Sequence, residues 1–83
     1  MAVVRKEYYY TGKGYYIQLE HYSYSVDCRV YNEDLKIQEF ISKDTKEEIE
    51  EELLTYFWYG GFDFELGEFD SIEECVKAHK SRG

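Results

Sequence analysis

Two histidines and two cysteines are the side chains of this chain best suited to covalent or proton-transfer chemistry. A thiolate beside an imidazole can form a nucleophile–base pair, so the candidates are His21, His79, Cys28 and Cys75. Their spacing matches no catalytic motif, and a structural zinc site needs four ligands at short spacings. We therefore expect no catalytic residue, and we expect two free thiols in a reducing cytoplasm. Whether the two cysteines form a disulfide is left open.

The segment Gly12-Lys13-Gly14 is the one stretch that resembles a phosphate-binding loop. It lacks the G-x-x-x-x-G-K-[ST] pattern, and it lies between two strand-like segments rather than between a strand and a helix. Two glycines that are free to take positive φ suit a tight turn. The segment therefore predicts a hairpin turn and no nucleotide cofactor.

The stretch DFELGEFD, residues 63–70, holds four carboxylates that could bind a divalent cation if a loop aimed them at one point. It does not meet the EF-hand pattern, because Gly67 takes the fifth place counted from Asp63. The acids alternate with apolar residues, which indicates that they face water along an extended segment. No metal site is predicted.

The net charge of −8 belongs entirely to the second half of the 83-residue chain. Residues 1–43 hold six acids and six bases, whereas residues 44–83 hold twelve acids and four bases. Such a chain repels nucleic acid and anionic membranes at long range and associates faster with basic partners. Neither a signal peptide nor a run of about 18 apolar residues is visible, so a cytoplasmic location is expected.

The first half reads as four antiparallel strands, expected over residues 3–10, 15–22, 22–31 and 35–41. Apolar side chains alternate with polar ones, which is typical of a meander with one face toward water. Tyr22 and Tyr24 are expected to share a face with the valines of the third strand. Leu35 and Ile37 are expected to point inward.

The second half reads as two helices. Thr45 and Glu48 form a capping box, and apolar residues from Ile49 onward recur at helical spacing until Gly60 and Gly61 end the helix. Residues 62–69 read either as a short strand or as an extended loop. A second helix is expected to begin after Ser71.

These elements predict a single α+β domain over residues 1–83. It has an antiparallel four-stranded meander sheet, with a fifth short strand left open, packed on one face by two helices. Eight of the ten tyrosines lie in the first 31 residues, so the outer sheet face is expected to be rich in tyrosine.

The run KEEIEEELL crowds like charges at helical spacing without a lysine four residues later, and each such pair costs about 0.2–0.5 kcal/mol. The run either serves solubility alone or is kept for a partner. The first hypothesis is a non-enzymatic inhibitor that covers the basic, nucleic-acid-binding surface of a partner protein. Such an inhibitor would be analogous, as a class, to anti-restriction and anti-CRISPR proteins, antitoxins and immunity proteins. The residues predicted to contact the partner are Glu47, Glu48, Glu50, Glu51, Trp58, Tyr59, Asp63, Glu65 and Glu68.

The alternative hypothesis is an accessory subunit that forms a homodimer through the tyrosine-rich sheet face, because tyrosine is enriched in interface hot spots. An enzyme or a direct nucleic-acid binder is a third class. Proteins that stack the bases of single-stranded nucleic acid on aromatic side chains also need a basic groove for the phosphates. The sequence indicates no such groove.

Overall fold

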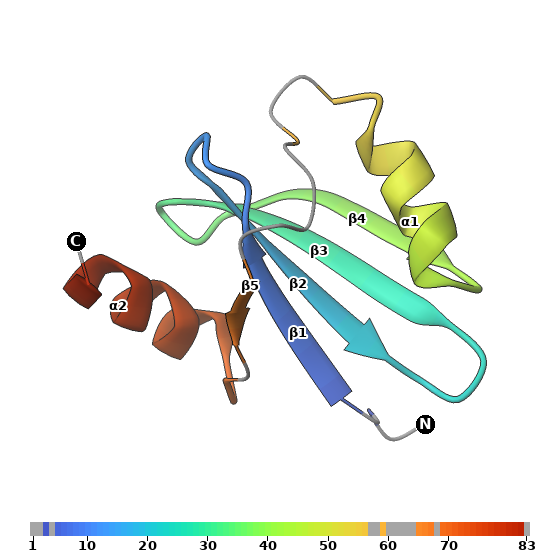
Figure 1. The fold of residues 1–83 in the computed structure, drawn as a ribbon, viewed down its shortest axis with the longest axis horizontal. Coiled ribbons are helices and arrows are strands. Elements are labelled where there is room, and N and C mark those ends of the chain that lie inside the picture. Colours follow the sequence, from blue (N-terminus) through green and yellow to red (C-terminus); the bar gives the residue numbers. More distant parts are fainter. Residues whose placement is uncertain (1–2, 4, 57–58, 60–64, 68, 83) are drawn as a thin grey trace.

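The computed structural model describes residues 3, 5–56, 59, 65–67 and 69–82. Five strands and two helices follow one another along the chain (Figure 1). They are β1 (Arg5–Tyr10), β2 (Tyr15–His21), β3 (Val26–Asn32), β4 (Ile37–Lys43), α1 (Lys46–Leu53), β5 (Glu65–Gly67) and α2 (Ile72–Arg82). The α+β class and the four-stranded meander are confirmed, and the fifth short strand is present. Within this part of the chain no helix has the length and apolarity needed to cross a membrane.

The five strands form one antiparallel sheet in the order β4-β3-β2-β1-β5. The turn at Gly12-Lys13-Gly14 joins β1 to β2, as predicted, and both glycines have positive φ (82° and 88°). In register, Tyr9 lies beside Ile17, which in turn lies beside Val30. The next residue of each strand points to the other face, so the sheet has two distinct sets of side chains.

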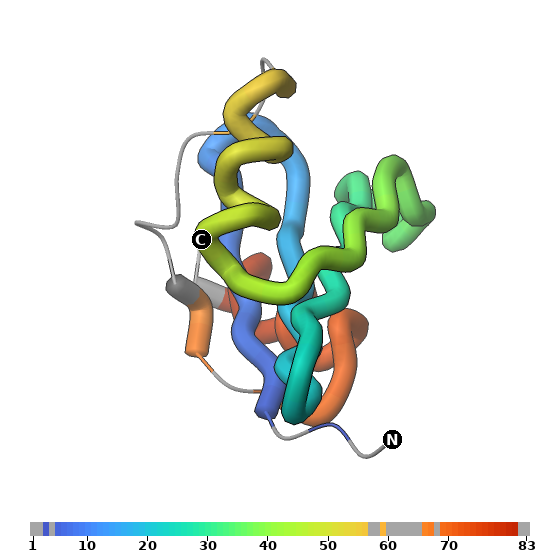
Figure 2. The backbone as a smooth tube through the Cα atoms, turned by 90° about the vertical axis from the view of Figure 1, so that its right-hand side faces the viewer, coloured from blue at the N-terminus to red at the C-terminus, as the bar shows by residue number. Residues whose placement is uncertain are grey.

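The two helices cover opposite faces of this sheet, which corrects the expectation that both pack on one face (Figures 1 and 2). On one face, Ile49 and Leu53 of α1 pack in a cluster with alternating residues of the central strands. On the other, α2 packs on a second cluster. The first cluster contains Tyr9, Ile17, Leu19, Val26, Cys28, Val30, Ile41, Ile49, Leu53 and Tyr59; the second contains Tyr8, Tyr16, Ile72, Cys75 and Val76.

The expected tyrosine-rich outer face is therefore covered by α2 rather than open to solvent. Tyr8 and Tyr16 are fully buried, and Tyr10 and Tyr31 are partly buried against the same cluster. The Nδ1 atom of His79, in α2, forms a 2.8 Å hydrogen bond with the Tyr16 hydroxyl. The surface that the homodimer hypothesis requires is thus largely occupied within one chain.

Two strand boundaries differ from the prediction. The alternation is confirmed for Val26, Cys28 and Val30, but Tyr22–Ser25 form a turn closed by a 2.8 Å bond from the Tyr22 N–H to the Ser25 carbonyl. Tyr24 is left exposed in this turn. Ile37 is 54% exposed rather than inward, because a bulge between β3 and β4 places it beside Tyr31 on the α2 face, beyond the helix.

Helix α1 begins as predicted but ends at Leu53, well before the glycines at 60 and 61, which lie outside the described residues. After Leu53 the backbone tightens to i→i−3 bonds, from Thr55 N–H to the Glu52 carbonyl (3.1 Å) and from Tyr56 N–H to the Leu53 carbonyl (3.0 Å). The Thr55 hydroxyl also donates to the Glu52 carbonyl (2.7 Å). Such side-chain bonds compete with the helical pattern and favour termination.

The Tyr8 hydroxyl is buried and has no hydrogen-bond partner among the described residues, whereas the hydroxyl of Tyr16, in the same cluster, has His79. Tyr8→Phe should leave stability unchanged or raise it by up to about 1 kcal/mol, because the desolvation cost of an unpaired hydroxyl is removed. Tyr16→Phe, the matched control, should lower stability by about 1 kcal/mol. Urea denaturation of both variants checks this. Equal losses in the two would contradict the assignment of an unpaired Tyr8 hydroxyl.

Candidate functional site

The outer side of α1 carries the exposed carboxylates. The Thr45 side chain accepts a hydrogen bond from the Glu48 N–H (3.3 Å), which confirms the predicted cap and fixes where the helix begins. Ile49 and Leu53 are completely buried and turn one stripe of the helix toward the sheet. Helical spacing therefore leaves the opposite side to Glu47, Glu48 and Glu51, all exposed.

A partly buried ionic cluster ties the first turn of α1 to the sheet. Lys46 Nζ lies 3.3 Å from Glu7 Oε2 and donates to the Tyr9 hydroxyl at 2.7 Å, and Tyr9 donates to Glu7 Oε2 at 2.5 Å. Arg5 and the His21 ring also contact Glu7 Oε1. The only base in the acidic run is thereby directed inward, away from the exposed carboxylates.

Glu7 is held in its charged form by this cluster. Burial raises the pKa of Glu7, but hydrogen bonds from Tyr9 and His21 and the positive charge of Lys46 act more strongly together. The pKa falls from 4.5 to about 2. Because Glu7 is fully ionised at neutral pH, it anchors Lys46 and hence the start of α1.

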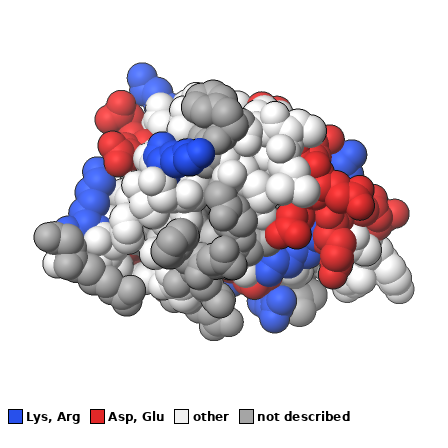
Figure 3. Space-filling view, turned by 45° about the horizontal axis from the view of Figure 1, so that its top comes forward, with Lys and Arg blue, Asp and Glu red and all other residues white. Residues whose placement is uncertain are grey.

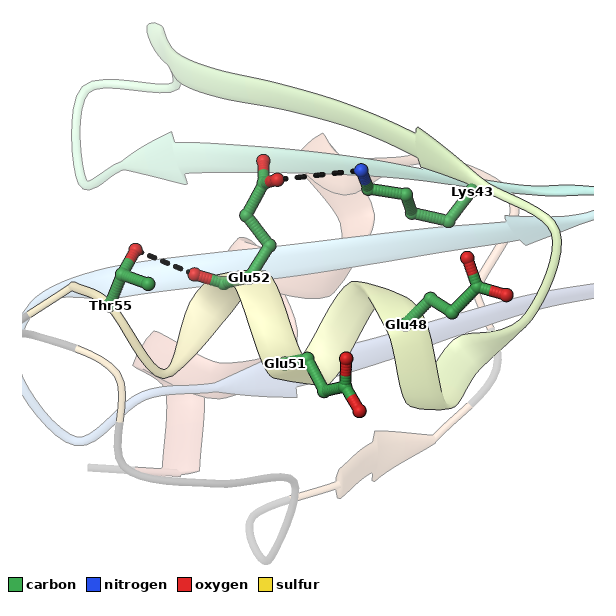
Figure 4. Close-up of a pocket in the computed structure, with 5 residues that line it drawn as sticks. All are labelled: Lys43, Glu48, Glu51, Glu52 and Thr55. Carbon is green, nitrogen blue, oxygen red and sulfur yellow. Dashed lines mark hydrogen bonds and ion pairs between the residues drawn. The ribbon is translucent and has the colours of Figure 1, made fainter.

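An open hollow of about 310 Å³ lies between α1 and the end of β4 (Figure 4). Its lining residues are Lys43, Glu48, Glu51, Glu52 and Thr55. Lys43 extends from β4 and forms a 3.5 Å ion pair with Glu52. Among the described residues, the carboxylates of Glu48 and Glu51 have no ion pair. The hollow is as large as a small ligand pocket, but its lining is charged rather than apolar, so it suits a cationic group.

The predicted contact residues are only partly brought together. Glu47, Glu48 and Glu51 share the exposed side of α1, whereas the Glu50 carboxylate accepts a 2.9 Å hydrogen bond from the Tyr59 hydroxyl. Tyr59 is only 9% exposed and packs in the core, so the prediction of Tyr59 as a surface anchor is wrong. Trp58, Asp63, Glu68 and the Glu65 side chain lie outside the described residues.

The acidic segment is divided between the two faces of the sheet. The glutamates of α1 lie on one side, and Figure 3 shows a group of acidic side chains at the right-hand end of the molecule, with basic side chains at its border. Asp70 precedes α2, and Glu73 and Glu74 lie in the first turn of α2, which packs on the opposite face. The docking surface is consequently smaller than the acidic segment, and it is centred on α1.

Three lining residues of the hollow, Lys43, Glu52 and Thr55, were absent from the predicted set. Glu52 follows Glu48 by one helical turn, so helical spacing alone could have identified it. Lys43 comes from the end of β4, and only residues 44 and 45 separate that strand from α1. The short connection was a signal that a strand-end side chain would reach the helix.

The histidines and cysteines form no catalytic arrangement among the described residues. His21 contacts Glu7 and His79 contacts Tyr16, and neither contact involves sulfur. Cys28 and Cys75 are free, buried, and in clusters on opposite faces of the sheet. Burial raises the pKa of Cys28 to about 12 and that of Cys75 to about 11, which keeps both thiols protonated and unreactive at neutral pH.

The chain was compared with known proteins at three levels. No family model, no curated protein and no solved structure matches it. Within the described residues, moreover, no three histidine, cysteine, aspartate or glutamate side chains are grouped so that they could hold a metal ion.

Proposed function

We propose that this protein is a non-enzymatic binding module whose α1 face docks on a basic surface of another protein. The supporting observation is the row of exposed carboxylates on Glu47, Glu48 and Glu51, none of which has an ion pair among the described residues. Lysine or arginine side chains of the partner would bond these carboxylates. One such side chain would enter the hollow beside Glu48 and Glu51.

The partner class follows from the chemistry of the docking face. Basic protein surfaces commonly serve to bind the phosphates of nucleic acid. A rigid helix that carries several carboxylates would compete for such a surface, and the protein would act as an inhibitor of nucleic-acid binding. Class analogues are the small acidic antagonists of bacterial defence systems, antitoxins and immunity proteins.

The test compares two triple variants of equal net charge. Glu47→Gln/Glu48→Gln/Glu51→Gln neutralises the α1 face, whereas Glu33→Gln/Asp34→Asn/Glu73→Gln neutralises three exposed acids elsewhere. With an arginine-rich peptide as the probe, the first variant should lose roughly tenfold or more in association rate. The second should stay close to wild type. Binding of the wild type should weaken as salt is raised.

Equal losses in the two triple variants would show that only net charge matters, and would overturn the α1 docking face. The inhibitory role needs a second measurement. Proteins captured by the wild type but not by the α1 variant should bind nucleic acid less tightly when the wild type is added. If their nucleic-acid binding is unchanged, the proposal of an inhibitor is wrong.

A further inference from the structure

Strand β4 forms one edge of the sheet, and its outer side bonds to no strand in the described part of the chain. The turn before β4 and the beginning of β4 lie at the upper right-hand margin of the molecule in Figure 2. The unpaired N–H and C=O groups of an edge strand are a template for pairing with another chain. Edge strands are usually protected by being short, by charges or by a cover, yet β4 is seven residues long.

The same strand exposes two large apolar side chains. Ile37 is 54% exposed and Phe40 is 51% exposed, and they are two of the four large apolar residues exposed in the described part of the chain. Both lie on the α2 face of the sheet, beyond the area that the helix covers. The Arg29 guanidinium lies 5.0 Å from the centre of the Phe40 ring and supports it from the neighbouring strand.

The charges of β4 are complementary to those of a second β4 strand that runs in the opposite direction. Glu39 and Lys43 both lie on the α1 face, because they are separated by four residues in the regular part of the strand. Ile41 lies midway between them. In an antiparallel pair of two β4 strands centred on Ile41, Glu39 of each copy lies opposite Lys43 of the other.

We propose that β4 pairs with β4 of a second copy in this register, joining the two sheets into one. Two opposite-charge pairs form on the α1 face, one on each side of the two-fold axis. On the α2 face, Phe40 lies opposite Ser42 of the second copy and diagonal to its Phe40, a spacing that aromatic rings can bridge. A two-fold contact of this kind is closed, so association stops at the dimer.

The neighbouring register is less favourable. Centred on Phe40, it places Glu39 opposite Ile41 of the second copy and moves Lys43 away from Glu39. Glu39 would then face an apolar side chain, and both charges would lose the opposite charge that faces them in the register centred on Ile41. Charge matching therefore selects one register, and this selection makes the pairing testable by charge exchange.

Two single variants and their mixture test the proposal by sedimentation velocity, which needs no external partner. Wild-type protein should show a concentration-dependent dimer. Glu39→Lys or Lys43→Glu alone places like charges opposite each other twice, so the dimer dissociation constant should rise roughly tenfold or more. An equimolar mixture of the two variants restores both opposite-charge pairs and should form a heterodimer close to wild-type affinity.

Matched controls carry the same charge changes away from β4. Glu33→Lys lies in the turn before β4 and Lys80→Glu lies on α2, and both residues are exposed. These variants should dimerise like the wild type. Circular dichroism verifies that each variant is folded, since Lys43 also contacts Glu52 within one chain.

Three results would overturn the pairing. They are a wild-type protein that stays monomeric up to millimolar concentration, a dimer that both β4 variants leave intact, and a mixture of folded variants that stays monomeric. The α1 variant Glu47→Gln/Glu48→Gln/Glu51→Gln distinguishes this proposal from the docking function. If it loses partner binding but still forms the dimer, the two surfaces act independently.

Discussion

Replacing Glu7 by alanine is expected to destabilise the protein by about 1.5–3 kcal/mol, because it removes the carboxylate that accepts hydrogen bonds from Tyr9 and Lys46. Glu7 contacts Arg5, Tyr9, His21 and Lys46, and its side chain is only 11% exposed. The free energy of unfolding of a small domain is about 5–15 kcal/mol in total, so this residue accounts for a substantial part of it. Thermal and urea denaturation measure the loss.

The matched control is Glu52→Gln. Glu52 also forms an ion pair with a lysine, but both side chains are more than a third exposed, at 42% and 38%. A pair in that setting contributes at most about 1 kcal/mol. If Glu7→Ala costs no more than Glu52→Gln, the cluster around Glu7 does not anchor α1.

The same carboxylate makes stability depend on pH. The pKa of Glu7 is about 2 in the folded protein and ordinarily 4.5, so the folded state binds the proton more weakly than the unfolded state does. The stabilisation is complete above pH 4.5 and is lost as pH falls toward 2. At about 1.4 kcal/mol per pH unit, it amounts to about 3 kcal/mol.

Glu7→Gln separates this contribution from that of the other carboxylates. The difference in unfolding free energy between wild type and Glu7→Gln should shrink as pH is lowered from 5 to 2, by about 3 kcal/mol. Urea denaturation at intervals across this range provides the measurement. A difference that stays constant with pH would show that Glu7 has an ordinary pKa in the folded state.

The sequence predicted the elements of this fold better than their arrangement. Residue periodicity identified the strands and helices because it is a local property. The side on which each helix packs depends on contacts between distant segments. The consecutive tyrosines Tyr8 and Tyr9 were nevertheless a signal, since neighbouring strand residues point to opposite faces and both are large and apolar. Both are buried, each under a different helix.

The candidate site was predictable where it is local to α1. The Thr45 cap fixed the beginning of the helix, and with it the exposed positions of Glu47 and Glu48. The direction of Lys46 was not predictable, because its partner Glu7 lies 39 residues earlier. The place where α1 ends was also missed, since side-chain and i→i−3 bonds terminate it before any glycine.

Leu53→Ala is expected to lower the unfolding free energy by about 2–5 kcal/mol, whereas Leu54→Ala should change it by no more than about 0.5 kcal/mol. The two residues are adjacent and chemically identical, but Leu53 is completely buried and Leu54 is 69% exposed. Only the buried side chain leaves a cavity in the core when it is truncated. Urea denaturation of the pair measures the contrast.

The contrast also tests the docking face, because Leu53 and Ile49 set the rotation of α1 about its axis. If α1 were turned so that Leu54 faced the sheet, Glu47, Glu48 and Glu51 would leave the outer side of the helix. Equal losses in the two leucine variants would therefore contradict both the packing of α1 and the carboxylate row proposed to bind a partner. A large loss confined to Leu53→Ala fixes that row on the solvent side, because the buried stripe and the acidic row lie on opposite sides of one short helix.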